Sequence, residues 1–231
     1  MNPTLILIII YLNLTATVQK NVHHRWNSML QEYVGDDGRV NYKGWLKERD
    51  NLNAYIKTLQ QFPPNESDSK NHKISYWINT YNALTVQLIL KNYPVSSIKD
   101  IKSPWDIDNF IIDEKRYSLG DIEHRILRKM KEPRIHFAIN CASESCPRLW
   151  NNAFQEKQLE QQLTKATERF LKDPSKNVIT PNHLKLSKIF LWFGKDFGSR
   201  KERLKFIERY SGIILKNPKI AYLSYDWSLN Q

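Results

Sequence analysis

The spacing of apolar residues between Ile74 and Leu88 constrains the fold more than any other feature of the sequence. Within the stretch ISYWINTYNALTVQLILKNYP, large apolar residues recur at intervals of three and four. This periodicity predicts a helix with a buried face, and Pro94 marks its end because proline cannot continue a helix. The apolar positions of the predicted helix are Ile74, Trp77, Ile78, Tyr81, Leu84 and Leu88.

Two asparagines interrupt this apolar helix. Asn79 and Asn82 lie three residues apart and share one face, although asparagine is a poor residue for a helix interior. Exposure to water would explain them simply, but the flanking Trp77 and Tyr81 favour burial. A buried amide requires hydrogen-bond partners. We therefore predict that Asn79 and Asn82 orient a ligand or a catalytic histidine.

The remaining segments alternate between helical and strand patterns. Ser118 is a candidate N-cap for a helix over 118–130, because Asp121 follows it by three residues. The alternation of RIHFAIN predicts a short strand over 134–140, and one or two short strands are expected within 177–193. Further helices are predicted over 42–59, 154–171 and 201–210. With 231 residues, the chain is expected to form one α+β domain, rich in helix, with a small sheet.

The first residues have the pattern of an export signal. An apolar run from Leu5 to Leu14 is too short to span a bilayer, and small residues follow it in TATVQ. No Lys or Arg precedes the run, so an uncleaved anchor is the alternative. We expect a signal peptide over 1–19, a helical segment and loop over 20–70, and a core domain with a basic extension over 71–231. The protein is expected to be exported, periplasmic or secreted, with no integral membrane span after cleavage.

A formal net charge of +11 raises the question of nucleic-acid binding. From Asn151 onward there are 15 Lys and Arg against 8 Asp and Glu, and in KERLKFIERY these charges alternate with apolar positions. That pattern is typical of the solvated face of an amphipathic helix, and no recognition-helix, zinc-finger or RNA-binding motif is present. We expect no nucleic-acid partner; the expected partner is a small molecule, a peptide or a cell-envelope component.

The only two cysteines of the chain lie in RIHFAINCASESCPRL, from Arg134 to Leu149. In an oxidising compartment, Cys141 and Cys146 could close a small loop as a disulfide. Alternatively, Cys146 is a nucleophile, His136 its general base, and Arg148 or the next helix N-terminus the anion stabiliser. A zinc site from His136 and the two cysteines lacks the close ligand pair of structural zinc sites. We expect no metal and no cofactor.

Other polar residues are candidates for ligand binding near His136. Glu123 and His124 would meet His136 if the helix over 118–130 packs over the strand. Asn140 lies on the same strand face as His136, but four strand residues separate them by about 13 Å, too far for direct contact. The predicted ligand-binding residues are Asn79, Asn82, Glu123, His124, Asn140 and Cys141.

Four stretches together resemble the domain-of-unknown-function family 547 (DUF 547). They begin at Tyr76, Ser118, Arg134 and Leu186 and read YWINTYNALTV, SLGDIEHRIL, RIHFAINCASESCPRL and LSKIFLWFGKDF. The closing YDWSLN, from Tyr225, is also similar to the end of bacterial stand-alone members. The resemblance would cover about 71–197. It implies a helix-rich α+β domain and carries no established reaction.

Two functions from different classes follow from these residues. One is a thiol-dependent hydrolase or acyl transferase that acts on peptide or cell-envelope material through Cys146, His136 and Arg148. The other is a non-enzymatic module that binds a ligand or partner in a cleft of aromatic and amide groups, stabilised by a Cys141–Cys146 disulfide. Both place a polar cleft around His136, the cysteines, Asn79 and Asn82.

Overall fold

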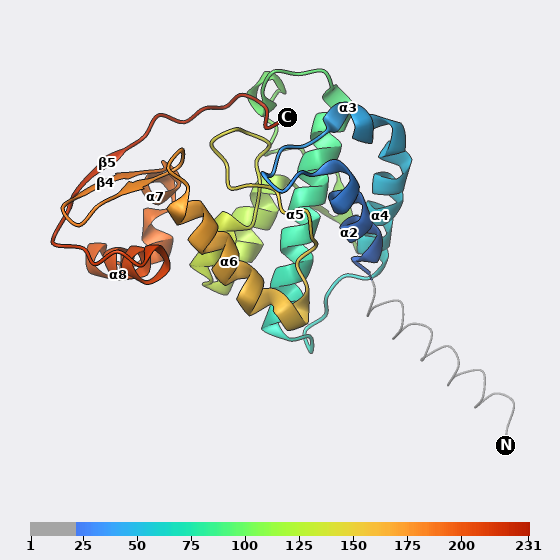
Figure 1. Ribbon diagram of the computed structural model, residues 1–231. Coiled ribbons are helices and arrows are strands. Elements are labelled where there is room, and N and C mark those ends of the chain that lie inside the picture. Colours follow the sequence, from blue (N-terminus) through green and yellow to red (C-terminus); the bar gives the residue numbers. More distant parts are fainter. Residues whose placement is uncertain (1–21) are drawn as a thin grey trace, which may run out of the picture.

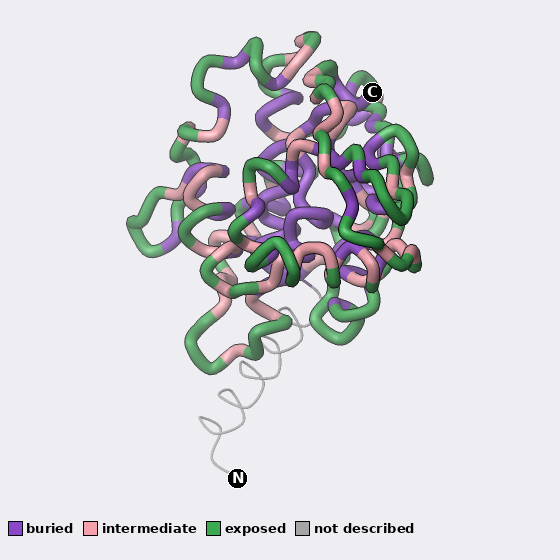
Figure 2. Tube along the Cα trace, turned by 90° about the vertical axis from the view of Figure 1, so that its left-hand side faces the viewer, coloured by how far each residue is buried: buried purple, intermediate pink, exposed green. Residues whose placement is uncertain are grey.

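The computed structural model describes residues 22–231 (Figure 1). Its centre is α5 (Lys70–Asn92), which begins at the N-cap Ser69, whose hydroxyl accepts a hydrogen bond from the His72 amide. Nearly every residue from Ile74 to Leu90 is buried, so the helix is surrounded by other elements on all sides. Figure 2 shows that the buried residues are concentrated in the interior of the molecule. The predicted helix, ending before Pro94, is confirmed.

The N-terminal helices cover one side of α5. They are α2 (His24–Tyr33), α3 (Tyr42–Trp45) and α4 (Arg49–Gln61), and they share one hydrophobic cluster with α5. A 3₁₀ turn, Leu46–Glu48, separates α3 from α4, so the predicted helix over 42–59 is two helices. Stacked aromatic rings fill the contact between these helices: Trp26, Tyr33, Trp45 and Tyr55.

The turn between α2 and α3 fits only with glycine. Gly38 has a φ of 84°, in the left-handed region, and a Cβ at this position would lie 2.5 Å from Cβ of Arg148. The close approach places the turn directly against the loop that follows the second cysteine.

A separate cluster of phenylalanines and aliphatic residues is formed mainly by residues between Ala166 and Tyr210. Here α6 (Leu159–Lys172) is preceded by a 3₁₀ turn, Glu156–Gln158, and followed by a three-stranded sheet in the order β3-β4-β5. Strand β4 (His183–Leu186) pairs antiparallel with β3 (Val178–Ile179) and parallel with β5 (Lys219–Tyr222). A hairpin of β1 (Phe110–Ile112) and β2 (Lys115–Tyr117) forms the other small sheet. The expected helix-rich α+β class is confirmed.

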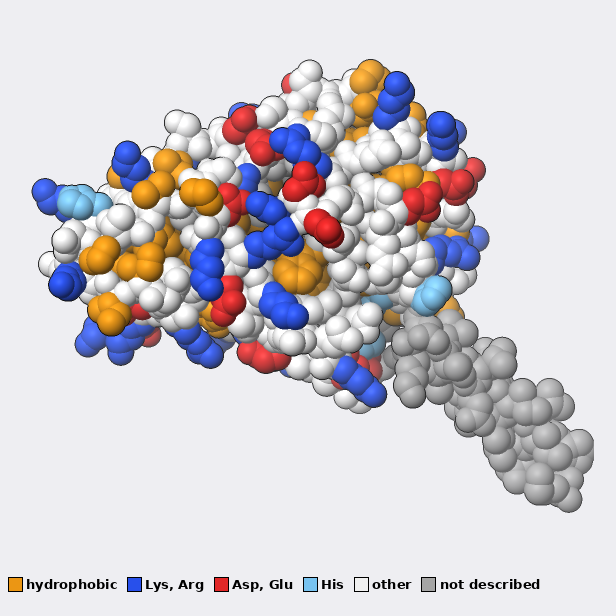
Figure 3. Space-filling model, in the orientation of Figure 1, with side chains coloured by type: hydrophobic (Ala, Val, Ile, Leu, Met, Phe, Trp, Pro, Cys, Tyr) orange, Lys and Arg blue, Asp and Glu red, His pale blue; other side chains and the backbone are white. Residues whose placement is uncertain are grey.

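The basic helix is α8 (Arg200–Ser211), which follows the short α7 (Ile189–Trp192) and the 3₁₀ helix η7 (Gly194–Phe197). Ile207 and Tyr210 are buried, whereas Lys201 and Lys205 are exposed. Figure 3 shows Lys and Arg side chains around this end of the molecule, with acidic side chains interspersed over the same face. The amphipathic pattern predicted for 201–210 is therefore confirmed.

The helix predicted over 118–130 contains an unusual turn. Ser118 Oγ accepts from the Asp121 amide, and the Asp121 carboxylate accepts from the Ser118 amide, as expected for the N-cap. The π-helix η3 (Asp121–Leu127) follows, and a 3₁₀ turn, Arg128–Met130, ends the segment. Such π turns recur at functional sites, where the extra residue per turn redirects side chains.

The predicted strand over 134–140 is wrong: the segment forms the 3₁₀ helix η5 (Pro133–Phe137). Pro133 occupies its first turn, where the fixed φ of proline favours a helical start. Residues 134–140 are all buried, so the apolar alternation does not separate a core face from a water face. Arg134 anchors the segment to α6 instead, through hydrogen bonds to both carboxylate oxygens of Glu160.

The C-terminal residues 223–231 form an extended strap that returns from the β-sheet to the N-terminal helices (Figure 1). Its backbone pairs with segments far away in the sequence: the Leu223 amide donates to Leu186, that of Leu229 to Ser96, and that of Glu144 to Ser228. The strap therefore joins the two hydrophobic clusters.

The predicted signal peptide over 1–19 lies outside the described residues. Within residues 22–231, no helix is long and apolar enough to cross a membrane.

Candidate functional site

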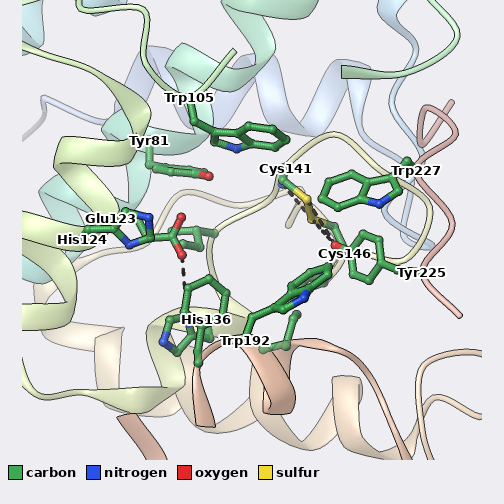
Figure 4. Close-up of a pocket in the computed structure, with 14 residues that line it drawn as sticks. Tyr81, Trp105, Glu123, His124, His136, Cys141, Cys146, Trp192, Tyr225 and Trp227 are labelled. Carbon is green, nitrogen blue, oxygen red and sulfur yellow. Dashed lines mark hydrogen bonds and ion pairs between the residues drawn. A yellow bond between two sulfur atoms is a disulfide. The ribbon is translucent and has the colours of Figure 1, made fainter. Parts of the chain in front are cut away.

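A pocket of about 270 Å³ opens where η3, η5, α7 and the strap meet the loop of residues 141–146, which we call the cysteine loop (Figure 4). Most of its wall is aromatic, and the polar groups in it are few. The aromatic residues are Tyr81, Trp105, Trp192, Phe193, Tyr225 and Trp227. The wall also contains titratable or sulfur-containing side chains: Glu123, His124, His136 and the two cysteines.

Glu123 extends from the π-helix η3 into this wall and is 7% exposed. Burial raises the pKa of Glu123 to about 7, because the charged carboxylate loses hydration in an apolar surrounding. The positive charge of Arg128 opposes this rise, whereas the negative charge of Asp196 adds to it. A carboxyl with a pKa near neutrality can release or accept a proton under ordinary conditions.

His136 connects Glu123 to a half-buried charge pair, Asp196 and Arg128. Its Nε2 lies 2.7 Å from Oδ2 of Asp196, its Nδ1 lies 4.0 Å from Oε1 of Glu123, and its ring stacks on Phe193 at 4.2 Å. Arg128 binds the same aspartate through Nε at 2.6 Å and Nη2 at 2.9 Å. Asp196 of η7 is thus bound by His136 of η5 and by Arg128, the first residue after η3.

The protonation states of this group follow from its contacts. Burial raises the pKa of Asp196, but hydrogen bonds from His136 and Arg128 outweigh burial and hold that pKa well below its ordinary value. Burial also lowers the pKa of His136, which favours the neutral ring near pH 7. An ionised aspartate only accepts hydrogen bonds, so His136 Nε2 donates to Asp196 and Nδ1 faces Glu123 as an acceptor.

A disulfide between Cys141 and Cys146 forms the opposite wall. The Cys141 amide donates to Cys146 Sγ at 2.9 Å, and the Tyr225 hydroxyl lies 3.3 Å from each sulfur. Of the three alternatives for these cysteines, the structure contains the disulfide. Both sulfurs are bonded, so neither is a thiolate nucleophile or a zinc ligand in this form.

Among residues 22–231, no group of three or more His, Cys, Asp or Glu side chains is placed to hold a metal ion.

Asn79 and Asn82 are buried, as predicted, but they clamp backbone rather than line the pocket. Asn79 Nδ2 donates to the Phe154 carbonyl at 2.7 Å, and its Oδ1 accepts from the Phe154 amide at 3.0 Å. Asn82 Nδ2 donates to the Ala138 carbonyl at 3.0 Å, and its Oδ1 accepts from the Asn140 amide at 2.8 Å. Both amides are occupied by the chain itself. Asn82 fixes the backbone between His136 and Cys141, so it positions the site from α5.

Asn140 and Arg148 lie on the other side of the cysteine loop. Asn140 braces this loop by donating to the Pro147 carbonyl and accepting from the Ala142 amide. Arg148 pairs with Asp173 at 3.0 Å. Both line a separate polar pocket of about 200 Å³, so the structure does not bring Arg148 to His136. It does bring His136, Glu123, His124 and both cysteines to the aromatic pocket.

Residues 65–171 match the protein family described as "Protein of unknown function, DUF547". The resemblance to this family that the sequence motifs indicate is thus confirmed over this segment. The match begins before α5 and ends within α6, so it contains Glu123, His136 and the disulfide, but it ends earlier than the expected limit at 197. No curated protein and no solved structure matches the chain.

Some residues that line the pocket lie outside the matched DUF547 segment. The sequence analysis did not predict them as site residues. These residues are Ile189, Trp192, Phe193, Tyr225 and Trp227. Asp196, which binds His136 beside the pocket, lies outside the segment as well. The signal was present, because LSKIFLWFGKDF and YDWSLN were two of the stretches that carried the family resemblance. Tyr81 and Trp105 were missed as well; Tyr81 was assigned only to the apolar face of its helix.

We expect Asn82→Ala to destabilise the DUF547 domain by about 2–4 kcal/mol, because it leaves a buried carbonyl at Ala138 and a buried amide at Asn140 without partners. Urea unfolding followed by circular dichroism measures this difference. The matched control is Asn92→Ala at the exposed end of the same helix, expected to change stability by no more than about 0.5 kcal/mol. Equal losses in the two variants would contradict the clamp.

The raised pKa of Glu123 predicts a pH-dependent stability. Between pH 4.5 and about 7 the unfolded chain releases the Glu123 proton while the folded domain retains it, so this group makes folding less favourable as pH rises through that window. The loss levels off above pH 7, at about 3 kcal/mol. Glu123→Gln should remove this loss, so the variant gains stability over the wild type at pH 8 but not at pH 4.5. Urea unfolding at both pH values tests this, and parallel profiles of the two proteins would refute it.

Proposed function

We propose that this DUF547 domain binds a small molecule in the aromatic pocket and acts as a binding module. The observation that carries the proposal is the composition of the wall: aromatic rings surround a single buried carboxyl and a few hydroxyl and imidazole groups. Small-molecule sites in proteins are concave and mostly apolar, with a few polar groups that fix orientation. A volume of about 270 Å³ suits a compact ligand, or the end of a peptide or cell-envelope component.

The disulfide favours binding over thiol chemistry. It places two sulfurs in the wall as a covalent brace, next to Tyr225 of the strap. The bond keeps the loop of residues 141–146 closed around the pocket and leaves no thiolate in it. The wall is therefore suited to hold a ligand without a covalent step.

Export is part of the proposal. Disulfides persist in oxidising compartments and are rare in the cytosol. The bonded pair supports this location, and the apolar run from Leu5 to Leu14 with its following small residues supports a signal peptide.

We expect ligands from a library of compact molecules to quench the fluorescence of the pocket tryptophans and to lose affinity about tenfold in Trp192→Ala. The neighbouring Leu191→Ala is the matched control, because Leu191 is also exposed but does not line the pocket. Titration of each hit against both variants measures the effect. Hits that bind the two variants equally well, or a library without any hit, would contradict the proposal.

A thiol-dependent hydrolase or acyl transferase is the second candidate, because Cys146 and His136 line the same pocket. It requires an external dithiol, which is oxidised to its disulfide as it delivers two electrons and two protons to give two thiols. Cys146 would then lose its proton to His136 and attack an acyl carbon, which expels an alcohol or amine that takes the proton back from His136; water or a second acceptor would release the acyl group from the resulting thioester. Arg148 has no part in this version, because it lies on the other side of the loop.

Alkylation with intact-mass measurement, before and after reduction, tests the two candidates. For the binding module we expect the mass to change only after reduction. For the thiol enzyme we expect the reduced protein to hydrolyse an activated ester, with loss of turnover in Cys146→Ser and retention in Cys141→Ser. Absence of turnover in the reduced wild type would exclude the second candidate.

A further inference from the structure

The charge balance of the aromatic pocket leaves one acidic group, Glu123, without a close cationic partner among the described residues, although Arg128 and Tyr81 favour its charged form. Asp196 and Arg128 neutralise each other through two hydrogen bonds. Burial lowers the pKa of both His136 and His124, so neither supplies a full positive charge near pH 7. Among the described residues, the only ion-pair contact of Glu123 is the 4.0 Å approach to His136. A ligand with one positive charge would complete this balance.

The aromatic wall is arranged to receive such a charge. Trp105 and Tyr81 lie on one side of the cavity, Trp192 lies across from them, and Tyr225 and Trp227 close the end beside the disulfide (Figure 4). Trp192 and Tyr225 have ring centroids 4.8 Å apart, and those of Tyr225 and Trp227 are 4.5 Å apart. The faces of such rings carry partial negative charge and attract cations.

Two rings of this wall already contact cations of the chain itself. Lys99 Nζ lies 5.3 Å from the ring centroid of Trp227, and the guanidinium carbon of Arg128 lies 5.3 Å from that of Phe193. Both distances are within the range of cation–π attraction. The rings therefore act as partners for positive charge elsewhere in the same structure.

We propose that the ligand of this pocket is a small organic monocation with an alkylated nitrogen, held among the faces of Trp105, Trp192 and Tyr225 with Glu123 as its counter-ion. The inference rests on the proposed binding function and specifies the chemical class of the ligand.

The composition of the wall selects an alkylated nitrogen over a primary ammonium. A primary ammonium carries three N–H donors and needs an acceptor for each when it leaves water. The wall offers the carboxyl of Glu123, the hydroxyl groups of two tyrosines and the imidazole nitrogens of His124 and His136, whereas the rest of its lining is mostly apolar and rich in aromatic rings. Methyl or methylene groups on the nitrogen spread the charge over C–H surfaces that pack on these rings without unpaired donors.

Binding of a cation should depend on pH through Glu123. Only the ionised carboxylate is a counter-ion, and burial holds the pKa of Glu123 near 7 in the empty pocket. Affinity for the cation should therefore rise about tenfold between pH 6 and pH 8. The titratable and charged groups that face Glu123 from the neighbouring elements are Tyr81, His124, Arg128, His136, Asp196 and Tyr225.

The test compares choline with 3,3-dimethylbutan-1-ol, which has the same shape but carries carbon in place of the charged nitrogen. Isothermal titration of the full chain at pH 8 should give at least tenfold tighter binding of choline. Glu123→Gln keeps the size of the side chain and removes its charge. This substitution should weaken the binding of choline about tenfold and leave the affinity for the alcohol unchanged. It should also abolish the rise in choline affinity between pH 6 and pH 8.

The outcomes separate this inference from the function on which it rests. Equal affinity for choline and the alcohol would overturn the cation inference and leave a pocket that binds by shape. Library ligands that are sensitive to Trp192→Ala, together with no binding of choline, would overturn it as well while the binding function stands. If no library ligand depends on Trp192, the binding function itself fails. Near-ultraviolet circular dichroism confirms that Glu123→Gln retains the fold.

Discussion

The buried amide clamps of α5 are the interactions on which the site depends. Asn79 and Asn82 each donate to a backbone carbonyl and accept from a backbone amide far away in the sequence. A buried side-chain amide that binds two backbone groups at once is costly to replace, because its removal leaves both backbone groups without this hydrogen bond in a place that water does not reach. The segment from His136 in η5 to Cys146 is therefore held against the buried helix α5, and its position is fixed by polar contacts as well as by apolar packing.

From this anchor, the pocket is completed by segments that lie late in the chain. Asp196 of η7 binds His136, and the strap places Tyr225 against the disulfide and Trp227 against Trp105. The strap also pairs with backbone on both sides of the pocket. The end of the chain is thus part of the site and of the connection between the two hydrophobic clusters, which explains why a wall built by residues 65–171 alone would be open.

Prediction from the sequence succeeded where the signal was local. The apolar spacing of α5, the N-cap at Ser118 and the amphipathic character of α8 depend on residues within one or two turns of each other. It failed at residues 134–140, because an apolar alternation indicates a strand only when one face is left in water, and here every residue is buried. Glu123 and His124 were matched with His136 on the condition that their helix packs over it, and they do share one pocket.

The sequence by itself determined the helix-rich α+β class, the central helix, the burial of its asparagines and the set of residues around the two cysteines. Only the tertiary structure decided that the asparagines bind backbone, that Arg148 pairs with Asp173, that Asp196 binds His136, and that the aromatic residues of the strap complete the pocket. The reason is physical: helix periodicity and capping are set by neighbours along the chain. Hydrogen-bond partners, the charge balance around Glu123 and the shape of a cavity are set by residues that come together only when the chain is folded.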